Sequence, residues 1–123
     1  MNRLISREGA ARADLATTFC AEHRATLLLK GSRTIVAESG LPVSYNTTGT
    51  PGMATGGMGD VLTGVCAALI AQKLALYDAA RLGAWVCGRA AEIATYNRGA
   101  SEQSLLPSDV LANLGGAFRD VYS

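Results

Sequence analysis

The segment 46–64, Asn-Thr-Thr-Gly-Thr-Pro-Gly-Met-Ala-Thr-Gly-Gly-Met-Gly-Asp-Val-Leu-Thr-Gly, constrains this chain more than any other. It contains six glycines, and Asp60 stands where they give way to the apolar run Val61–Ala71. A long run rich in Ala and Leu predicts a helix, so a glycine-rich loop leads directly into a helix N-terminus. Free backbone N–H groups and the positive end of the helix dipole make such a place attractive to anions, above all phosphate.

Two interpretations of this loop are possible. The amides of Gly57, Met58 and Gly59 can converge on one point and stabilise a developing negative charge. Asp60 would then accept the proton of a substrate hydroxyl that attacks a phosphoryl group. Alternatively, Asp60 only caps the helix. We favour the anion site, because glycine loses the most conformational freedom on folding and a mere cap does not require six glycines. The pattern is neither a Walker loop nor a dinucleotide-binding GxGxxG fingerprint.

The stretch Lys30-Gly31-Ser32-Arg33-Thr34 is the second candidate site. It follows a short strand-like run, and ligands of α/β sheets bind where strands end. The Lys30 and Arg33 cations and the hydroxyls of Ser32 and Thr34 are suited to phosphate or ribose. The alternative is a polar hairpin turn between two strands.

Hydrophobic periodicity and turn signals predict an α/β layered fold in one domain, residues 1–123. Leu15 and Phe19, together with Ala11 and Ala16, are expected to form the apolar stripe of the first helix. The pair Gly115-Gly116 is expected to end or kink the last one. Three short strands indicate part of a larger sheet. The predicted strands are 26–29, 34–37 and 43–45, and the predicted helices are 6–24, 59–74, 77–96 and one that opens at Pro107.

Composition excludes several classes of protein. With 49% apolar and 17% charged residues in 123, the chain is globular, and a net charge of +1 indicates neither nucleic-acid nor membrane binding. The single histidine, His23, excludes a His-based zinc site or a Ser-His-Asp triad. Cys20, Cys66 and Cys87 fit no metal pattern and are expected to be reduced thiols of a cytoplasmic protein. No signal peptide or membrane span is predicted.

The glycine-rich segment, from Asn46 and Gly49 through Gly64, closely resembles the signature of the ADP/ATP-dependent NAD(P)H-hydrate dehydratases. Leu28-Leu29-Lys30-Gly31-Ser32-Arg33-Thr34 resembles the nucleotide-binding Lys-Gly-x-x-Thr stretch of that family. The two motifs have the order and separation found there. The resemblance extends to Leu106-Pro107-Ser108-Asp109.

The resemblance implies a ribokinase-like α/β fold, here its C-terminal portion with about three short strands and four helices. It implies repair of hydrated NADH and NADPH (NADHX and NADPHX): ADP or ATP with Mg²⁺ phosphorylates the 6-hydroxyl, and phosphate then leaves. By motif match, Lys30–Thr34 and Gly59 would contact the nucleotide, and Gly57–Gly59 would form the anion hole. Asp60 would contact the hydrated dinucleotide and act as base. No metal ligand is assigned to the chain.

The sequence departs from the family pattern in three ways. Thr50 stands where Asn is usual, and Cys87, expected to serve packing, stands where His often precedes Gly88. The family's catalytic domain is also more than twice as long, and its N-terminal part has no counterpart here. The chain is therefore expected to be a truncated product, a stable fragment or one piece of a split enzyme. An uncovered sheet predicts a homo-oligomer or a separate N-terminal half as partner.

Two other functions remain open from the sequence. A small-molecule kinase of the same superfamily, acting on a sugar or vitamin alcohol, would share the Gly-x-Gly-Asp pattern. The stretch Pro51–Gly56 favours the dehydratase over this kinase. A non-catalytic module that binds nucleotide or only associates with itself is the third possibility. Binding without turnover would identify it.

Overall fold

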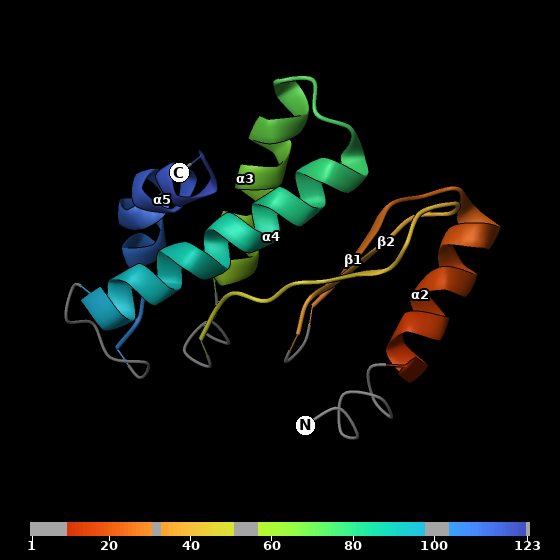
Figure 1. Ribbon diagram of the computed structural model, residues 1–123, viewed down its shortest axis with the longest axis horizontal. Helices are drawn as coiled ribbons and strands as arrows, with labels where there is room; N and C mark the ends of the chain where they lie inside the picture. Colours follow the sequence, from red (N-terminus) through yellow and green to blue (C-terminus); the bar gives the residue numbers. More distant parts are fainter. Residues whose placement is uncertain (1–9, 31–32, 51–56, 98–103, 123) are drawn as a thin grey trace. The chain divides into compact units, whose positions relative to one another are not determined.

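The computed structural model describes residues 10–30, 33–50, 57–97 and 104–122, and the chain divides into two compact units (Figure 1). The N-terminal unit comprises residues 1–46 and the C-terminal unit residues 47–123. Each unit has its own buried apolar cluster. The described residues form four α-helices and one three-stranded sheet, which confirms the predicted α/β class. Among them, no helix combines the length and apolarity needed to cross a bilayer.

The sheet of the N-terminal unit is an antiparallel meander in the order β1-β2-β3. Its strands are β1 (Leu27–Leu29), β2 (Ile35–Ala37) and β3 (Ser44–Tyr45). Leu28 pairs with Val36, and Ile35 pairs with Tyr45. Between β2 and β3 the chain turns through Gly40, whose φ of 84° lies in the left-handed region that glycine adopts without a steric cost. All three predicted strands are thus present, each slightly shorter than expected.

Helix α2 (Ala10–His23) packs on β1 and β2 through small side chains. Ala16 and Cys20 are buried against Ala37, and the Cys20 thiol donates a hydrogen bond to the Ala37 carbonyl at 3.3 Å. The predicted apolar stripe was right for Ala16 but wrong for its larger members, since Leu15 is 70% exposed and Phe19 is 41% exposed. Ala11 is exposed as well. The small residues of α2, Ala16 and Cys20, are the ones that lie against the sheet. The first residues of the predicted helix 6–24, up to residue 9, lie outside the described residues.

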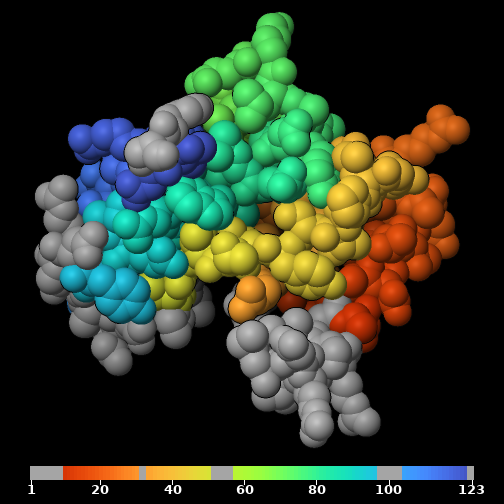
Figure 2. Space-filling model, viewed as in Figure 1, coloured from red at the N-terminus to blue at the C-terminus, as the bar shows by residue number. Residues whose placement is uncertain are grey.

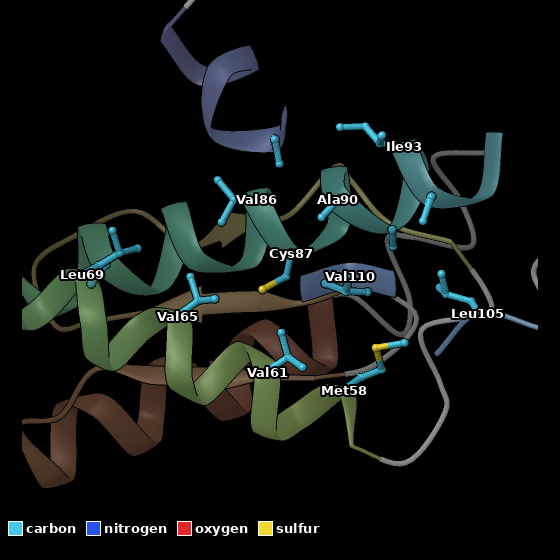
Figure 3. Packing of buried hydrophobic residues seen from close by; sticks show 14 residues of the cluster. Met58, Val61, Val65, Leu69, Val86, Cys87, Ala90, Ile93, Leu105 and Val110 are labelled. Carbon is cyan, nitrogen blue, oxygen red and sulfur yellow. The ribbon is translucent and has the colours of Figure 1, made fainter. Parts of the chain in front are cut away.

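Helix α4 (Leu76–Glu92) is the centre of the C-terminal unit. It packs against α3 (Met58–Ala71) and α5 (Pro107–Tyr122), and it continues into the π-helical turn η3 (Ile93–Asn97). Figure 3 shows side chains of α3, among them Val65, pointing toward α4. One face of α4, continued by Ile93 of η3, is buried at spacings of three and four residues: Ala79, Gly83, Val86, Ala90 and Ile93.

The ends of the helices follow from local chemistry. At the end of α3, Lys73 takes a φ of 77°, and the Leu74 N–H donates to the Leu69 carbonyl at 3.2 Å. That bond, with the one from the Lys73 N–H to the Ile70 carbonyl at 2.9 Å, is a Schellman motif. In α5 the expected termination at Gly115-Gly116 was wrong, because the helix continues to Tyr122. Burial of Ala117 and Val110 holds this helix against the core despite the two glycines.

Candidate functional site

The N-terminus of α3 is formed as the sequence predicted. Gly57 precedes the helix with a φ of 93°, and the first intrahelical bond runs from the Val61 N–H to the Gly57 carbonyl at 3.3 Å. The first four N–H groups of an α-helix have no intrahelical acceptor, and here they belong to residues 57–60. Gly57 is exposed and Gly59 is partly exposed. The start of α3 therefore presents backbone donors at the positive end of the helix dipole.

Asp60 is the third residue of α3, and its side chain is exposed. The N-cap position belongs to Gly57, so the alternative in which Asp60 is the cap residue was wrong. Asp109 occupies the same third position in α5, and there the carboxylate accepts a hydrogen bond from the Leu106 N–H at 2.8 Å. No such bond to Asp60 exists among the described residues.

Lys30–Thr34 connects β1 to β2 as a hairpin, which agrees with the structural alternative for this stretch. The side chains of Lys30 and Arg33 are exposed, and Thr34 is partly buried, while Gly31 and Ser32 lie outside the described residues. The Arg12 guanidinium, from α2, donates hydrogen bonds to the carbonyls of Arg33 (2.9 Å), Lys30 (3.0 Å) and Leu29 (3.2 Å). This arginine holds the hairpin through its backbone and leaves the two hairpin cations exposed.

The beginning of the glycine-rich segment is held by charged side chains. The Gly49 N–H donates to Glu92 Oε2 at 3.0 Å, and Gly49 has a φ of 119°. Glu92 Oε1 pairs with Arg89 Nη1 at 3.2 Å, and Arg89 Nε donates to Asp120 Oδ2 of α5 at 2.7 Å. The bonds to Asp120, and then to Glu92, raise the pKa of Arg89 above its ordinary value. A connected chain of charge-assisted bonds therefore links α5, α4 and Gly49.

Two of the cysteines lie between α3 and α4. The Cys66 thiol donates to the Ala79 carbonyl at 3.7 Å, and burial raises its pKa. Cys87 is buried in the core, and burial, together with the nearby Cys66, raises its pKa to about 12. Thiols held neutral in this way are inert, so Cys87 serves packing, as expected. Cys20, Cys66 and Cys87 are all free thiols.

The predicted site residues fall into two groups. Gly57, Met58, Gly59 and Asp60 are contiguous at the start of α3 in the C-terminal unit, whereas Lys30–Thr34 belongs to the N-terminal unit. Met58 has its side chain buried in the core, so only its backbone can serve a ligand. Among the described residues, no group of three His, Cys, Asp or Glu side chains could hold a metal ion.

Sequence reasoning missed the residues that support these segments. Arg12 carries no motif, and nothing in the sequence connects it to a hairpin that begins 18 residues later. Arg89 and Glu92 lie three positions apart on one helix, but the contact of Glu92 with Gly49 spans 43 residues. The signal that was available is the spacing of a basic and an acidic residue three positions apart.

Comparison with known proteins places the chain in a family. Residues 1–113 match the model of a family described as NAD(P)H-hydrate dehydratase. A bifunctional NAD(P)H-hydrate repair enzyme, Nnr, of Moorella thermoacetica is 42% identical over 125 residues, covering 98% of this chain and 23% of the relative. Its counterpart in Vibrio cholerae is 48% identical over 88 residues, covering 72% of this chain and 17% of the relative. The chain thus spans about a fifth of the length of these curated relatives.

Solved structures show the same fold. An ADP/ATP-dependent NAD(P)H-hydrate dehydratase from Bacillus subtilis, co-crystallised with ATP and Mg²⁺, superposes with a TM-score of 0.82 at 24% identity. The match covers 94% of this chain and 41% of that one. A likeness at this level of identity establishes the fold of the chain, which is the α/β fold that the sequence predicted.

Proposed function

The chain belongs to the NAD(P)H-hydrate dehydratase family, and we propose that it carries the phosphoryl-transfer site for the nucleotide-dependent repair of hydrated NADH and NADPH. The observation that carries this proposal is the start of α3, where glycine amides lie beside an exposed carboxylate, Asp60. Support comes from the family match and from relatives named as repair enzymes, among them an ADP-dependent (S)-NAD(P)H-hydrate dehydratase of Neisseria meningitidis.

In the proposed reaction, Asp60 accepts the proton of the 6-hydroxyl while the hydroxyl oxygen attacks the terminal phosphorus of ADP or ATP. The bond from that phosphorus to its bridging oxygen breaks, and the shortened nucleotide leaves. The amides of Gly57, Met58 and Gly59 stabilise the negative charge on the transferring group. The carbon–oxygen bond then breaks, phosphate leaves, and loss of a proton from the neighbouring ring carbon restores the double bond of NAD(P)H.

We further propose that the nucleotide contacts the hairpin Lys30–Thr34 as well as Gly59. The exposed cations of Lys30 and Arg33 suit phosphate, and the hydroxyl of Thr34 suits phosphate or ribose. Gly31 and Ser32 belong to the proposed contact by motif alone. Arg12 supports this role by bonding the hairpin carbonyls, which leaves the hairpin side chains available.

We expect Mg²⁺ to bind together with the nucleotide, and not at a metal site formed by the chain alone. The described residues provide no cluster of three metal-ligating side chains. Mg²⁺ commonly keeps several waters and is held by substrate phosphates with one or two carboxylates. When bound, it would neutralise phosphate charge, and no protein-ligated metal site is proposed.

We propose that residues 1–123 form part of one ribokinase-like domain and function with a partner, either a second copy or a separate polypeptide that supplies the rest of the fold. The matched solved chain is more than twice as long, since the match covers 41% of it. The exposure of Leu15 and Phe19 on α2 supports a missing contact surface. Analytical ultracentrifugation tests the proposal: a clean, thermally stable monomer would contradict self-association. The free thiols support a cytoplasmic location.

Calorimetry with ADP and ATP, in the presence of Mg²⁺, tests the nucleotide site. Heat of binding is expected for the natural chain and is expected to disappear in Gly59→Val, whose side chain blocks the approach of phosphate to the backbone. No heat at millimolar nucleotide would contradict the site.

A second measurement follows turnover with hydrated NADH as the substrate, with a separate N-terminal half supplied if needed. Release of NADH and phosphate supports the dehydratase, whereas a stable phosphorylated product would indicate a kinase, and binding without turnover a non-catalytic module.

A further inference from the structure

The beginning of the glycine-rich segment lies on one face of α4. The Thr48 hydroxyl donates to the Trp85 carbonyl at 2.8 Å. A Cβ atom on Gly88 would overlap the Thr48 hydroxyl and would lie 2.7 Å from its carbonyl carbon. The backbone of Thr48 therefore lies in direct contact with α4 at Gly88. Figure 2 shows the yellow surface of this segment beside the teal surface of α4.

A second attachment lies one helical turn further along α4. Glu92 accepts the Gly49 N–H at 3.0 Å with one carboxylate oxygen and binds Arg89 with the other. Its side chain is only 22% exposed. Trp85, Gly88 and Glu92 succeed one another at spacings of three and four, so a single helix face carries both attachments.

The other end of the segment is held by a different helix. Gly57 packs against the ring of Pro107, the first residue of α5. Asp120, near the end of α5, holds the guanidinium that orients Glu92. Both ends of the segment that leads to Asp60 are thus connected to α5. Gly57 contacts α5 directly, whereas Gly49 is connected to it through Glu92 and Arg89.

We propose that Glu92 is a positioning residue that sets the geometry of the anion-binding amides at the start of α3. Glu92 holds Gly49 and is itself bonded, through Arg89, to Asp120 of α5, the helix whose first residue packs against Gly57. Amides that converge on phosphate require placement within a fraction of an ångström, so contacts that fix Gly49 and α5 together contribute to that placement. The inference rests on the proposed function, because the amides matter only if they bind phosphate.

The test compares Glu92→Ala, Glu92→Gln and Asp78→Ala by NMR of the full chain without ligand. Asp78 is the matched control, because it forms an ion pair with Arg81 at 3.8 Å, three positions away on the same helix, and has no described contact with the segment. In Glu92→Ala, exchange of the Gly49 amide proton should accelerate about tenfold, as expected for one lost hydrogen bond. The amide resonances of Met58 and Gly59 should also shift.

Glu92→Gln retains an acceptor for Gly49 and should keep most of the protection and the natural resonances. Asp78→Ala should match the natural chain in both measurements. Unchanged resonances of Met58 and Gly59 in Glu92→Ala would overturn the proposal, as would a Gln variant that behaves like the Ala variant. If Glu92→Ala does not fold, the comparison of Glu92→Gln with Asp78→Ala decides, and accelerated exchange of Gly49 in the Gln variant would overturn the proposal.

A second measurement separates this inference from the proposed function. ATP binding is measured by calorimetry on the same three variants, and Glu92→Ala should bind about 10- to 100-fold more weakly, the usual effect of losing a residue that orients a site. If the natural chain binds no ATP, the proposed function fails while the NMR comparison still decides the positioning role. If it binds ATP and Glu92→Ala binds equally well, the positioning role fails alone.

Discussion

Gly57 and Pro107 are in such close contact that a Cβ atom on the glycine would lie 2.9 Å from Cγ of the proline ring. The contact joins the last residue before α3 to the first residue of α5. Gly57 also has a φ of 93°, a conformation that side chains disfavour. Two independent constraints therefore require glycine where the proposed anion site begins.

Gly57→Ala should destabilise the protein by about 1–3 kcal/mol, because the new methyl group strains the backbone and displaces Pro107. Gly64→Ala is the matched control: it lies within α3, and a Cβ there meets no atom within 4 Å. That control should gain about 0.5–1 kcal/mol, since alanine favours a helix interior. Urea unfolding of both variants measures the difference. Equal effects of the two substitutions would contradict the role given to Gly57.

Gly88→Ala should detach Thr48 from α4, because its methyl group would lie 2.8 Å from the Thr48 carbonyl oxygen. We expect a loss of stability of about 1–3 kcal/mol, the usual cost of overpacking. Gly115→Ala, in the interior of α5 with no atom within 4 Å of the new Cβ, should instead stabilise by about 0.5–1 kcal/mol. Thermal unfolding of the two variants distinguishes a close contact from a general effect of helix propensity.

Asp60 and Asp109 occupy the same position in their helices and should respond differently to replacement. Asp109→Ala removes the acceptor of the Leu106 N–H and should cost about 0.5–2 kcal/mol of stability. Asp60→Ala loses only the interaction with the helix dipole, about 0.3–1 kcal/mol.

If Asp60 is the base, Asp60→Asn should keep the fold and much of the nucleotide affinity, yet lower turnover by roughly 10²–10⁴. Near-normal turnover by Asp60→Asn would show that the carboxylate is structural.

Stability should fall at alkaline pH because of Cys87. Burial, and then the nearby Cys66, raise the pKa of this thiol from its ordinary 9.0 to about 12. Between these values the unfolded chain loses the proton and the folded chain keeps it. The stabilisation is therefore complete below pH 9 and declines as pH rises toward 12, with a slope of up to about 1.4 kcal/mol per pH unit. Urea unfolding at pH 8 and pH 10 should show a smaller decline for Cys87→Ala than for the natural protein.

Thr50 offers a test of an uncompensated polar group. Its hydroxyl oxygen is buried and has no hydrogen-bond partner among the described residues. Thr50→Val has nearly the same shape and removes this hydroxyl, so stability should stay the same or rise by up to about 1 kcal/mol. Thr48→Val is the contrasting variant, because it removes the bond to the Trp85 carbonyl and should lose about 0.5–1.5 kcal/mol. A loss of equal size in both variants would show that Thr50 has a partner of its own.

The predictions from sequence succeeded where the signal is local. The helix after Asp60 and the buried face of α4 follow from periodicity, and the strands follow from short runs of β-branched or aliphatic residues between turn signals. The α/β class was confirmed for the same reason. The start of this helix was predicted at residue 59, and the structure begins it one residue earlier, at Met58.

The predictions failed where distant residues decide. Leu15 and Phe19 have a helical spacing that indicates burial, but the residues buried against the sheet are the smaller Ala16 and Cys20. The two glycines of α5 weaken a helix that packing nevertheless maintains. The contact of Glu92 with Gly49 carries no sequence signal, because its partners are far apart in the chain. The roles of Lys30–Thr34 and Asp60 remain predictions.

The attachment of Gly49 to Glu92 also bears on how the protein is made. The two residues are 43 positions apart, and the ribosome synthesises Gly49 first. At ordinary rates of synthesis, roughly 2–9 s pass before Glu92 follows. During that interval the nascent segment has neither α4 nor α5 to hold it. The attachment of Gly49 therefore forms only after α4 has emerged, and the bond from Arg89 to Asp120 that orients Glu92 forms later still, after α5.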